Sequence, residues 1–181
     1  MNIFYTNHEP TLCAQEHCDK HTVKMILEYC QLLSTAHRVL DGKEYVDTSS
    51  GRKIKRWKLN DSYDDVLYKA THISHPSAIW ARTGCENYQW LHSLLVALSK
   101  EYTFRYGKIH KCEQIGLIDK LSHSPINIST KLFTEPPACM PDEYKVVGDS
   151  IASYRNYVKN GKKPLHNWKN RNTPDFIGIK L

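Results

Sequence analysis

The stretch EHCDKHTVKMILEYCQLLSTAH, residues 16–37, carries polar side chains at a helical spacing. Four of them follow one another at intervals of four, three and four residues: His17, His21, Lys24 and Glu28. Gln31 and Thr35 continue the same row. At about 100° per residue, such intervals place side chains along one face of an α-helix. An amine, a carboxylate and two imidazoles in one row predict either an ordinary polar face or a reactive one.

Three interpretations of this row are open. Two histidines at four-residue spacing can share a metal ion. The third ligand would come from His72, His75 or Glu28, although no H-E-x-x-H pattern is present. Alternatively, a lysine near an imidazole and a carboxylate can attack an electrophilic carbon and form an imine. In the third interpretation the row is plain polar packing, and Lys24 with Glu28 is an ordinary i,i+4 ion pair.

The sequence lacks the motifs of several enzyme classes. It contains no Walker loop, Rossmann glycine fingerprint, zinc-finger spacing or Ser-His-Asp order, which argues against kinases, NTPases and dinucleotide enzymes. The six cysteines include no C-x-x-C pair. Cys18 and Cys30 would lie about 18 Å apart on one helix, too far for a disulfide. We therefore expect reduced thiols in an intracellular protein, with no metal and no cofactor.

Basic residues gather in three places, each beside aromatic rings. The formal net charge of the chain is +6. The tail from Arg155 onwards contains seven Lys or Arg and one Asp, so its own net charge is also +6. The other clusters are RKIKRWK, residues 52–58, and RYGKIHK, residues 105–111. Basic groups beside flat rings can neutralise phosphates and stack on bases. The predicted nucleic-acid contacts are Lys53, Lys55, Arg56, His75, Arg82, Arg105, Lys108, Lys111, Trp168, Lys169 and Arg171.

These residues require helices to position them. The 181 residues predict one compact domain, 1–181, mainly α, with three or more helices and a small β-hairpin insertion. The expected elements are a long first helix at 11–40, a hairpin at 44–59, a second helical region at 76–106, a third helix at 149–160 and a basic C-terminal tail. The buried stripe of the first helix would be Val23, Ile26 or Leu27, Cys30, Leu33 and Leu40.

Turn and cap residues set the expected boundaries. Gly42 ends the first helix, and Ser-Ser-Gly at 49–51 turns the hairpin. Pro76 opens the second helical region, and Gly107 ends it. Asp149 caps the third helix. The first residues, MNIFYTNHEPT, lack the basic and apolar regions of a signal peptide, and no run of about 18 apolar residues exists, so we expect a cytoplasmic protein without membrane contact.

Two stretches resemble the landmarks of a known family. LCAQEH, residues 12–17, is similar to the Leu-x-x-Gln-His stretch through which pyrimidine-dimer DNA glycosylases, typified by phage endonuclease V, enter a long helix. SHPSAIWARTGCENYQWLHSLLVALSKEYTFRYGKIHK resembles their histidine-containing turn, second long helix and basic corner. The likeness covers residues 1–40 and 72–112. The chain also resembles uncharacterised proteins of tailed phages.

The resemblance implies excision of damaged pyrimidines. In the family, an N-terminal α-amine attacks the sugar carbon and a glutamate on the first helix assists. Here Asn2 is large enough that we expect Met1 to remain, which differs from the family's exposed amine. Aligned on His17, the family's glutamate position falls at Lys24, and Glu28 follows one turn later. Either the activity is lost or altered, or Lys24 replaces the terminal amine as the group that forms the imine.

We predict a DNA-acting enzyme of the glycosylase or glycosylase/lyase type that works on a modified or damaged pyrimidine. Lys24 would be the nucleophile, and Glu28 an acid, a base or a stabiliser of charge. His17 and His21 would position groups or transfer protons. Because base chemistry requires extrusion from the stack, the expected partner is double-stranded DNA, bound by a monomer in the host cytoplasm. The alternatives are a transferase that modifies phage DNA bases, a non-catalytic nucleic-acid-binding protein and a metal hydrolase.

Overall fold

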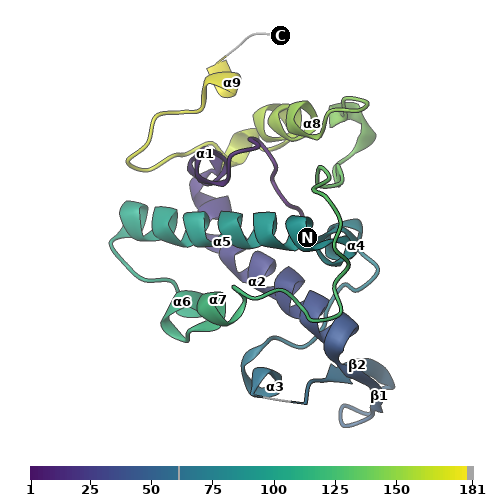
Figure 1. Ribbon diagram of the computed structural model, residues 1–181. Coiled ribbons are helices and arrows are strands. Elements are labelled where there is room, and N and C mark those ends of the chain that lie inside the picture. The colour runs from purple at the N-terminus through teal and green to yellow at the C-terminus, as the bar shows by residue number, and fades with distance from the viewer. Residues whose placement is uncertain (61, 179–181) are drawn as a thin grey trace.

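Two long helices cross and organise the molecule (Figure 1). They are α2, Asp19–Asp41, and α5, Cys85–Tyr106. The structure is a computed structural model that describes residues 1–60 and 62–178. It confirms a mainly α domain with a small hairpin, and its buried core draws on the N-terminal arm, both long helices and the C-terminal segment. Lys180 of the predicted basic tail lies outside the described residues.

Shorter elements surround the crossing. The α-helices are α1 Pro10–Glu16, α3 Tyr63–Val66, α4 Pro76–Thr83, α6 Lys111–Gln114, α7 Leu117–Lys120, α8 Ser150–Asn156 and α9 Asp175–Gly178. Two 3-10 turns span Asp142–Tyr144 and Lys163–Leu165, and a π-helical turn spans Tyr157–Gly161. The strands are β1 Lys43–Asp47 and β2 Ile54–Lys58. No helix in the described ranges is long and apolar enough to cross a membrane.

The predicted continuous helix at 11–40 is wrong, because the chain breaks between α1 and α2. His17 and Cys18 are extended, with ψ of 129° and 161°. The break is stabilised from a distance. The guanidinium of Arg105 on α5 donates to the carbonyl oxygens of Gln15 and His17, each at 2.9 Å. These bonds satisfy carbonyl groups at the end of α1 that have no partner within the helix.

The predicted buried stripe of the first helix is partly wrong. Cys30 and Leu33 are buried, and so is Ile26 of the alternatives Ile26 and Leu27, while Leu27 is 38% exposed. Leu40 is partly buried, and Val23 is 43% exposed. The N-terminal arm explains the difference, since it covers the neighbouring face of α2. The Phe4 amide donates to the Tyr29 hydroxyl at 3.3 Å, and the Phe4 ring is itself buried. The arm therefore buries a side of α2 that helical periodicity alone would leave exposed to solvent.

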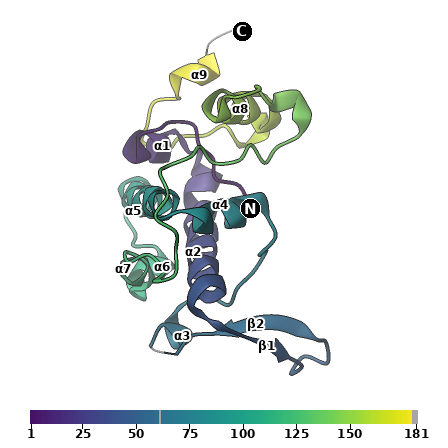
Figure 2. The ribbon, with the colours of Figure 1, turned by 45° about the vertical axis from the view of Figure 1, so that its right-hand side comes forward.

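The hairpin is confirmed and projects from the C-terminal end of α2 (Figure 2). Its antiparallel register pairs Lys43 with Lys58, Glu44 with Trp57, Tyr45 with Arg56, Val46 with Lys55 and Asp47 with Ile54. Directly paired residues share a face of a sheet. One face therefore carries the Lys43, Lys58, Tyr45 and Arg56 side chains, and the other carries those of Trp57 and Lys55 with their partners.

The second helical region consists of α4 and α5, separated at an extended glycine. Gly84 has φ of −157°, and a side chain there would come within 2.9 Å of the Lys131 Cβ. Pro76 opens α4 at its first turn, and Gly107 ends α5 in the left-handed region at φ of 63°. The third helix ends earlier than predicted as an α-helix. It runs Ser150–Asn156, continues as the π-helical turn, and is capped by Asp149, which accepts from the Ala152 amide at 2.8 Å.

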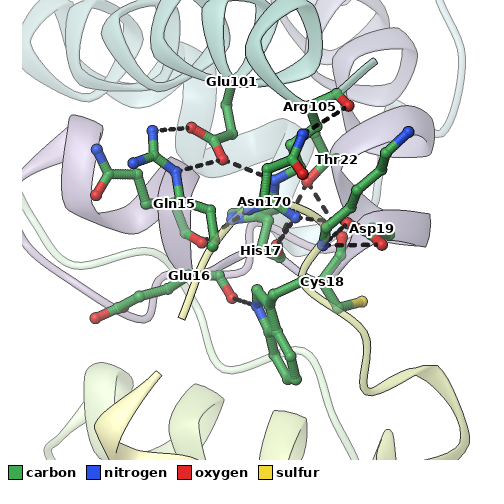
Figure 3. A network of polar contacts seen from close by, with 12 residues as sticks. Gln15, Glu16, His17, Cys18, Asp19, Thr22, Glu101, Arg105 and Asn170 are labelled. Atoms are coloured by element: carbon green, nitrogen blue, oxygen red, sulfur yellow. Dashed lines mark hydrogen bonds and ion pairs between the residues drawn. The ribbon is translucent and has the colours of Figure 1, made fainter. Parts of the chain in front are cut away.

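One buried guanidinium joins the chain segments at the centre (Figure 3). The Arg105 side chain is fully buried, and it binds Glu101 at 2.7 Å and Asp19 at 2.9 Å in addition to the carbonyls of α1. The same two carboxylates hold the C-terminal segment. Arg171 donates to both Glu101 oxygens, and the Asn167 amide donates to Asp19 at 2.6 Å. The segment predicted as an irregular tail is thus anchored to the helix crossing.

Replacement of Arg105 by methionine should strongly destabilise the fold. Methionine keeps much of the volume, but it removes the ion-pair partner of Asp19 and the guanidinium that donates to two carbonyls. Breaking a buried ion pair by removing one partner costs about 3–5 kcal/mol. We expect a fall of that size in the free energy of unfolding, measured by urea denaturation. Arg171→Met serves as the control, since Arg171 is partly exposed and should cost clearly less. Equal losses would contradict the central role of Arg105.

Candidate functional site

Lys24 and Glu28 form an ion pair on the part of α2 that packs against α4. The Lys24 ammonium lies 3.0 Å from Glu28 Oε1. The Lys24 side chain is 70% exposed, whereas that of Glu28 is 15% exposed. The amine is therefore accessible to a substrate, and the carboxylate is held at the edge of the packed interior. Of the four predicted catalytic residues, these two meet at the surface.

His75 joins this pair from the start of α4. Its Nδ1 accepts a hydrogen bond from the Ser77 amide at 3.1 Å. A neutral imidazole that accepts at Nδ1 carries its proton on Nε2. Burial lowers the pKa of His75, the α-amino group of Met1 and the His72 ring lower it further, and Glu28 opposes them. The neutral His75 ring therefore presents an N–H donor, and the charges of Met1 and Glu28 both influence its pKa.

Met1 belongs to the same place, since the Ser77 hydroxyl donates to the Met1 carbonyl oxygen at 3.2 Å. We use the name Glu28 site for the set Met1, Lys24, Glu28, His72 and His75. It combines two amines, one carboxylate and two imidazoles. The sequence row suggested a similar mixture of groups, but the imidazoles come from another part of the chain.

The loop that carries His72 has an unusual backbone. His72 has φ of 49°, in the left-handed region that residues other than glycine seldom adopt. Its Nδ1 lies 2.8 Å from the Thr71 hydroxyl oxygen. Thr35 of α2 holds the loop from below, since its hydroxyl donates to the Thr71 carbonyl at 3.3 Å and accepts from the Thr71 amide at 3.2 Å. Thr35 is thus buried beneath the site, where it holds the backbone of the loop, and it is not one of the accessible groups.

His17, by contrast, belongs to the buried core. It is 2% exposed, and both ring nitrogens are engaged. Nδ1 lies 2.7 Å from the Cys13 carbonyl oxygen and must donate to it, so Nε2 accepts from the Tyr29 hydroxyl at 2.9 Å. Burial lowers the pKa of His17 to about 4. The prediction that His17 shares one helix face with Lys24 and Glu28 is wrong, because the chain break turns this residue inward.

His21 is also inside, under the N-terminal arm. It is 6% exposed and stacks on Phe4 with 3.9 Å between ring centroids. Its Nδ1 has no hydrogen-bond partner in the described part of the chain. Burial, and after it the nearby His17 ring, lower the pKa of His21 to about 3. His21 is therefore a neutral core ring, and Lys24, three residues further along α2, adds to the lowering of its pKa.

The histidine pair is also unsuited to a metal. Both nitrogens of His17 already make hydrogen bonds, and the two rings stand edge to face with centroids 6.4 Å apart. In residues 1–60 and 62–178 no group of three or more His, Cys, Asp or Glu could hold a metal ion.

Among the predicted nucleic-acid contacts on the hairpin and near α4, Lys53 and Lys55 are exposed, whereas Arg56, His75 and Arg82 are partly buried. Lys53 is exposed next to the turn. Lys55 pairs with Glu44 at 2.9 Å, and Arg56 lies 3.8 Å from Asp47. Arg82 has a structural role, since its guanidinium donates to the Ala78 and Ile73 carbonyls at 2.7 Å each.

The predicted contacts further along the chain are largely structural. Arg105 is fully buried, and Trp168 is 7% exposed and donates to the Glu16 carbonyl at 3.0 Å. Their prediction as surface contacts is wrong. Lys169 lies over the Tyr106 ring at 5.4 Å, and Arg171 is paired with Glu101. The others, Lys108 and Lys111, are exposed.

A hollow of about 720 Å³ lies away from the Glu28 site, between α1, α5 and Arg171. A second one, of about 600 Å³, adjoins it and shares Gln15 and Arg171. Size alone would favour this groove as a binding site. Its buried carboxylate, Glu101, is however already neutralised by Arg105 and Arg171. The Glu28 site offers the accessible amine, carboxylate and imidazole together, so chemistry favours it over the larger groove.

Comparison with known proteins adds no relative. Neither protein-family models nor curated proteins nor solved structures give a match to the chain. The function must therefore be argued from the Glu28 site. Sequence reasoning did not connect Met1 or His72 to Glu28, because no periodic pattern relates an N-terminal arm to a loop before α4. The dipeptide His75–Pro76 was the signal available for His75. Proline is common at the first position of a helix, so the residue before it lies at the start of that helix.

His21→Phe should make the protein less sensitive to acid. The folded pKa of His21, about 3, lies below the value of roughly 6.5 expected in the unfolded chain. The unfolded state therefore binds more protons between these values, and stability contributed by the neutral ring is lost as pH falls from about 6.5 towards 3. Phenylalanine keeps the stacking on Phe4, does not titrate, and removes an unpartnered nitrogen.

We expect His21→Phe to raise the free energy of unfolding at about pH 4.5 by roughly 2 kcal/mol relative to the parent, and by less at pH 7.5. Denaturant titrations at several pH values measure this difference. His17→Phe is the comparison, since it loses two hydrogen bonds and should destabilise at both pH values. An unchanged pH slope in His21→Phe would contradict the assignment.

Proposed function

We propose that this protein is a DNA-acting enzyme of the glycosylase or glycosylase/lyase type, with the Glu28 site as its reaction centre. The observation that carries the proposal is the Lys24–Glu28 ion pair at the surface, with His75 near enough for Glu28 to act on its pKa. An amine, a carboxylate and an imidazole N–H donor are the groups needed to form an imine at a sugar carbon. The resemblance of the N-terminal region to pyrimidine-dimer DNA glycosylases gives a substrate class, a damaged or modified pyrimidine.

The reaction can be written with these groups alone. The unprotonated amine of Lys24 attacks C1′ of the sugar, and the bond from C1′ to the base breaks with its electron pair on the base. The neutral His75 ring donates a hydrogen bond from its Nε2–H to the departing base, and the base takes the proton that the Lys24 ammonium released when it became the free amine. Glu28 takes a proton from the attacking amine and returns it to O4′ as the sugar ring opens. The product is a protonated imine between Lys24 and C1′.

The surroundings of the site support a polyanionic substrate. The hairpin carries six Lys or Arg and two acidic residues between positions 43 and 58. In both ribbon views it projects on the side of the molecule that also carries α4 and the N-terminus (Figure 1, Figure 2). Phosphates of a duplex bound at the hairpin can therefore extend towards the Glu28 site. Extrusion of a base from that duplex would expose its C1′ to the amine.

Borohydride trapping tests the proposal. A duplex with an abasic site presents the sugar as an aldehyde, and reduction of its imine leaves a stable covalent adduct. We expect the adduct in the parent protein, its loss in Lys24→Ala, and a rate about 10²–10⁴-fold lower in Glu28→Gln. Lys20→Ala is the matched control, because Lys20 is an exposed lysine one turn earlier on α2.

Two outcomes would change the proposal. Absence of any adduct, with either abasic or pyrimidine-dimer duplexes, would rule out the imine mechanism. An adduct that survives in Lys24→Ala, and that peptide mass mapping assigns to Met1, would transfer the nucleophilic role to the α-amine and keep the site. Asn2 and the Ser77 contact to Met1 would then become the residues to vary next.

A non-catalytic nucleic-acid-binding protein is the second candidate. The observation that favours it is the i,i+4 spacing of Lys24 and Glu28, which is that of an ordinary stabilising ion pair. In that case Lys24→Ala and Glu28→Ala would leave affinity for DNA nearly unchanged, while loss of hairpin charges would weaken it and its salt dependence. The trapping experiment separates the two candidates directly.

A further inference from the structure

The segment 69–75 connects the hairpin to the Glu28 site, and basic groups follow it. At the hairpin end, Arg56 and Lys69 line a common hollow of about 360 Å³. Hydrogen bonds from Ser49 chiefly lower the pKa of Asp47, and Lys69 and Arg56 also contribute to it. Both cations therefore act on one carboxylate, which lies next to the turn on the hairpin face that carries Tyr45.

Arg56 has an unused donor in this hollow. Its Nε is buried and has no hydrogen-bond partner in the described part of the chain, and Asp47 is 3.8 Å away. A buried donor without an acceptor is uncommon, because it loses its bond to water without replacement. Lys55, the next residue along β2, points to the opposite face and pairs with Glu44. The Arg56 donor without a hydrogen-bond partner thus lies on the face of the hairpin that carries Tyr45, and Lys55 lies on the other face.

From Lys69 the chain runs back along α2 towards the site. The Thr35 hydroxyl fixes Thr71, and Arg82 fixes the Ile73 carbonyl, so the segment has a defined path. His72 is exposed, and the His75 amide donates to its carbonyl at 2.8 Å. We use the name basic track for the set Arg56, Lys69, His72, His75 and Lys24.

Most acidic residues near the track already have ion-pair or hydrogen-bond partners. Asp64 pairs with Arg38 at 2.6 Å, and Glu28 pairs with Lys24. Asp47 accepts two hydrogen bonds from Ser49. Asp65 is exposed at the rim of the hollow. Lys69 is exposed and the Arg56 side chain is 23% exposed, so both remain accessible to a further anion.

The length of the track suits a nucleic-acid backbone. From Glu28 to the end of α2 there are thirteen residues, or about 20 Å at 1.5 Å per residue. At a rise of roughly 3.4 Å along the duplex axis for each nucleotide of one strand, this length corresponds to about six nucleotides. A two-stranded ribbon also has the width that the major groove of a duplex admits. Regularly spaced anions beside a groove are a property of duplex DNA.

We propose that the basic track holds one sugar–phosphate backbone of duplex DNA, with the hairpin as an arm that contacts the duplex about six base pairs from the reacting nucleotide. The inference rests on the proposed function, because the Glu28 site defines where that nucleotide lies. It adds a directional requirement. The substrate must be double-stranded on the side that reaches the hairpin, and its other side can be short.

Two asymmetric duplexes test this requirement. Each contains a tetrahydrofuran abasic analogue, which cannot form an imine, with a flank of roughly one helical turn on one side and about three base pairs on the other. The second duplex reverses the flanks. Fluorescence anisotropy across a sodium chloride titration measures both affinities. We expect the parent protein to bind one duplex at least about tenfold more tightly than the other.

Charge-removing variants locate the effect. Lys69→Gln and Arg56→Gln should each abolish the preference and lower the salt slope for the preferred duplex by about one. Lys55→Gln is the matched control, because it removes the same charge from the opposite face and should keep the preference. Lys69 is exposed in a loop, so its variant is expected to fold, and circular dichroism checks both.

Three results would overturn the inference. They are equal affinity for the two duplexes, an equal effect of Lys55→Gln and Lys69→Gln, and equal affinity for the corresponding single strands. The trapping experiment is independent of these measurements. If no covalent adduct forms while the preference and its loss in Lys69→Gln persist, the proposed chemistry fails and the basic track stands.

Discussion

The fold depends on one guanidinium without access to water. Removing a charge from water is unfavourable unless good geometry and further hydrogen bonds compensate for it. Arg105 meets this requirement with two carboxylates and two carbonyls. Its partners belong to α1, to the start of α2 and to α5. The carboxylates in turn hold Asn167 and Arg171. Four hydrogen bonds from one arginine thus determine how three helices and the C-terminal segment meet.

The chain break that Arg105 stabilises separates structural groups from accessible ones. If α1 and α2 were continuous, His17 would lie on the same helix face as Lys24. With the break, His17 turns towards Tyr29, and the N-terminal arm covers His21. Lys24 and Glu28 stay at the surface. Imidazoles for the site then come from the loop before α4. The combination of an amine, a carboxylate and two imidazoles suspected from the sequence is present. Its imidazoles, however, belong to His72 and His75.

Local signals in the sequence were sufficient where the chain determines its own conformation. Pro76, Gly107 and Asp149 mark helix boundaries through φ restriction, a left-handed residue and a side-chain cap, and each is confirmed. Long-range effects were not accessible in the same way. Nothing local shows that Arg105 binds the carbonyls of residues 15 and 17, or that an N-terminal arm covers one side of α2. For the same reason Val23 and Leu27, apolar by type, are exposed.

Composition was the weakest guide to where the charge can be used. The segment after Arg155 accounts for a charge equal to that of the whole chain, yet much of it holds the protein together. Arg155 lies 3.7 Å from Glu16, Arg171 binds Glu101, and the Lys162 ammonium lies over the Tyr157 ring at 4.7 Å. On the hairpin, by contrast, Lys53 is exposed and Arg56 keeps an unused donor. A cation contributes to binding a polyanion only insofar as the fold has not already neutralised it. The hairpin therefore provides positive charge that can bind a polyanion. A count of charged residues along the sequence would place most of that charge in the C-terminal tail.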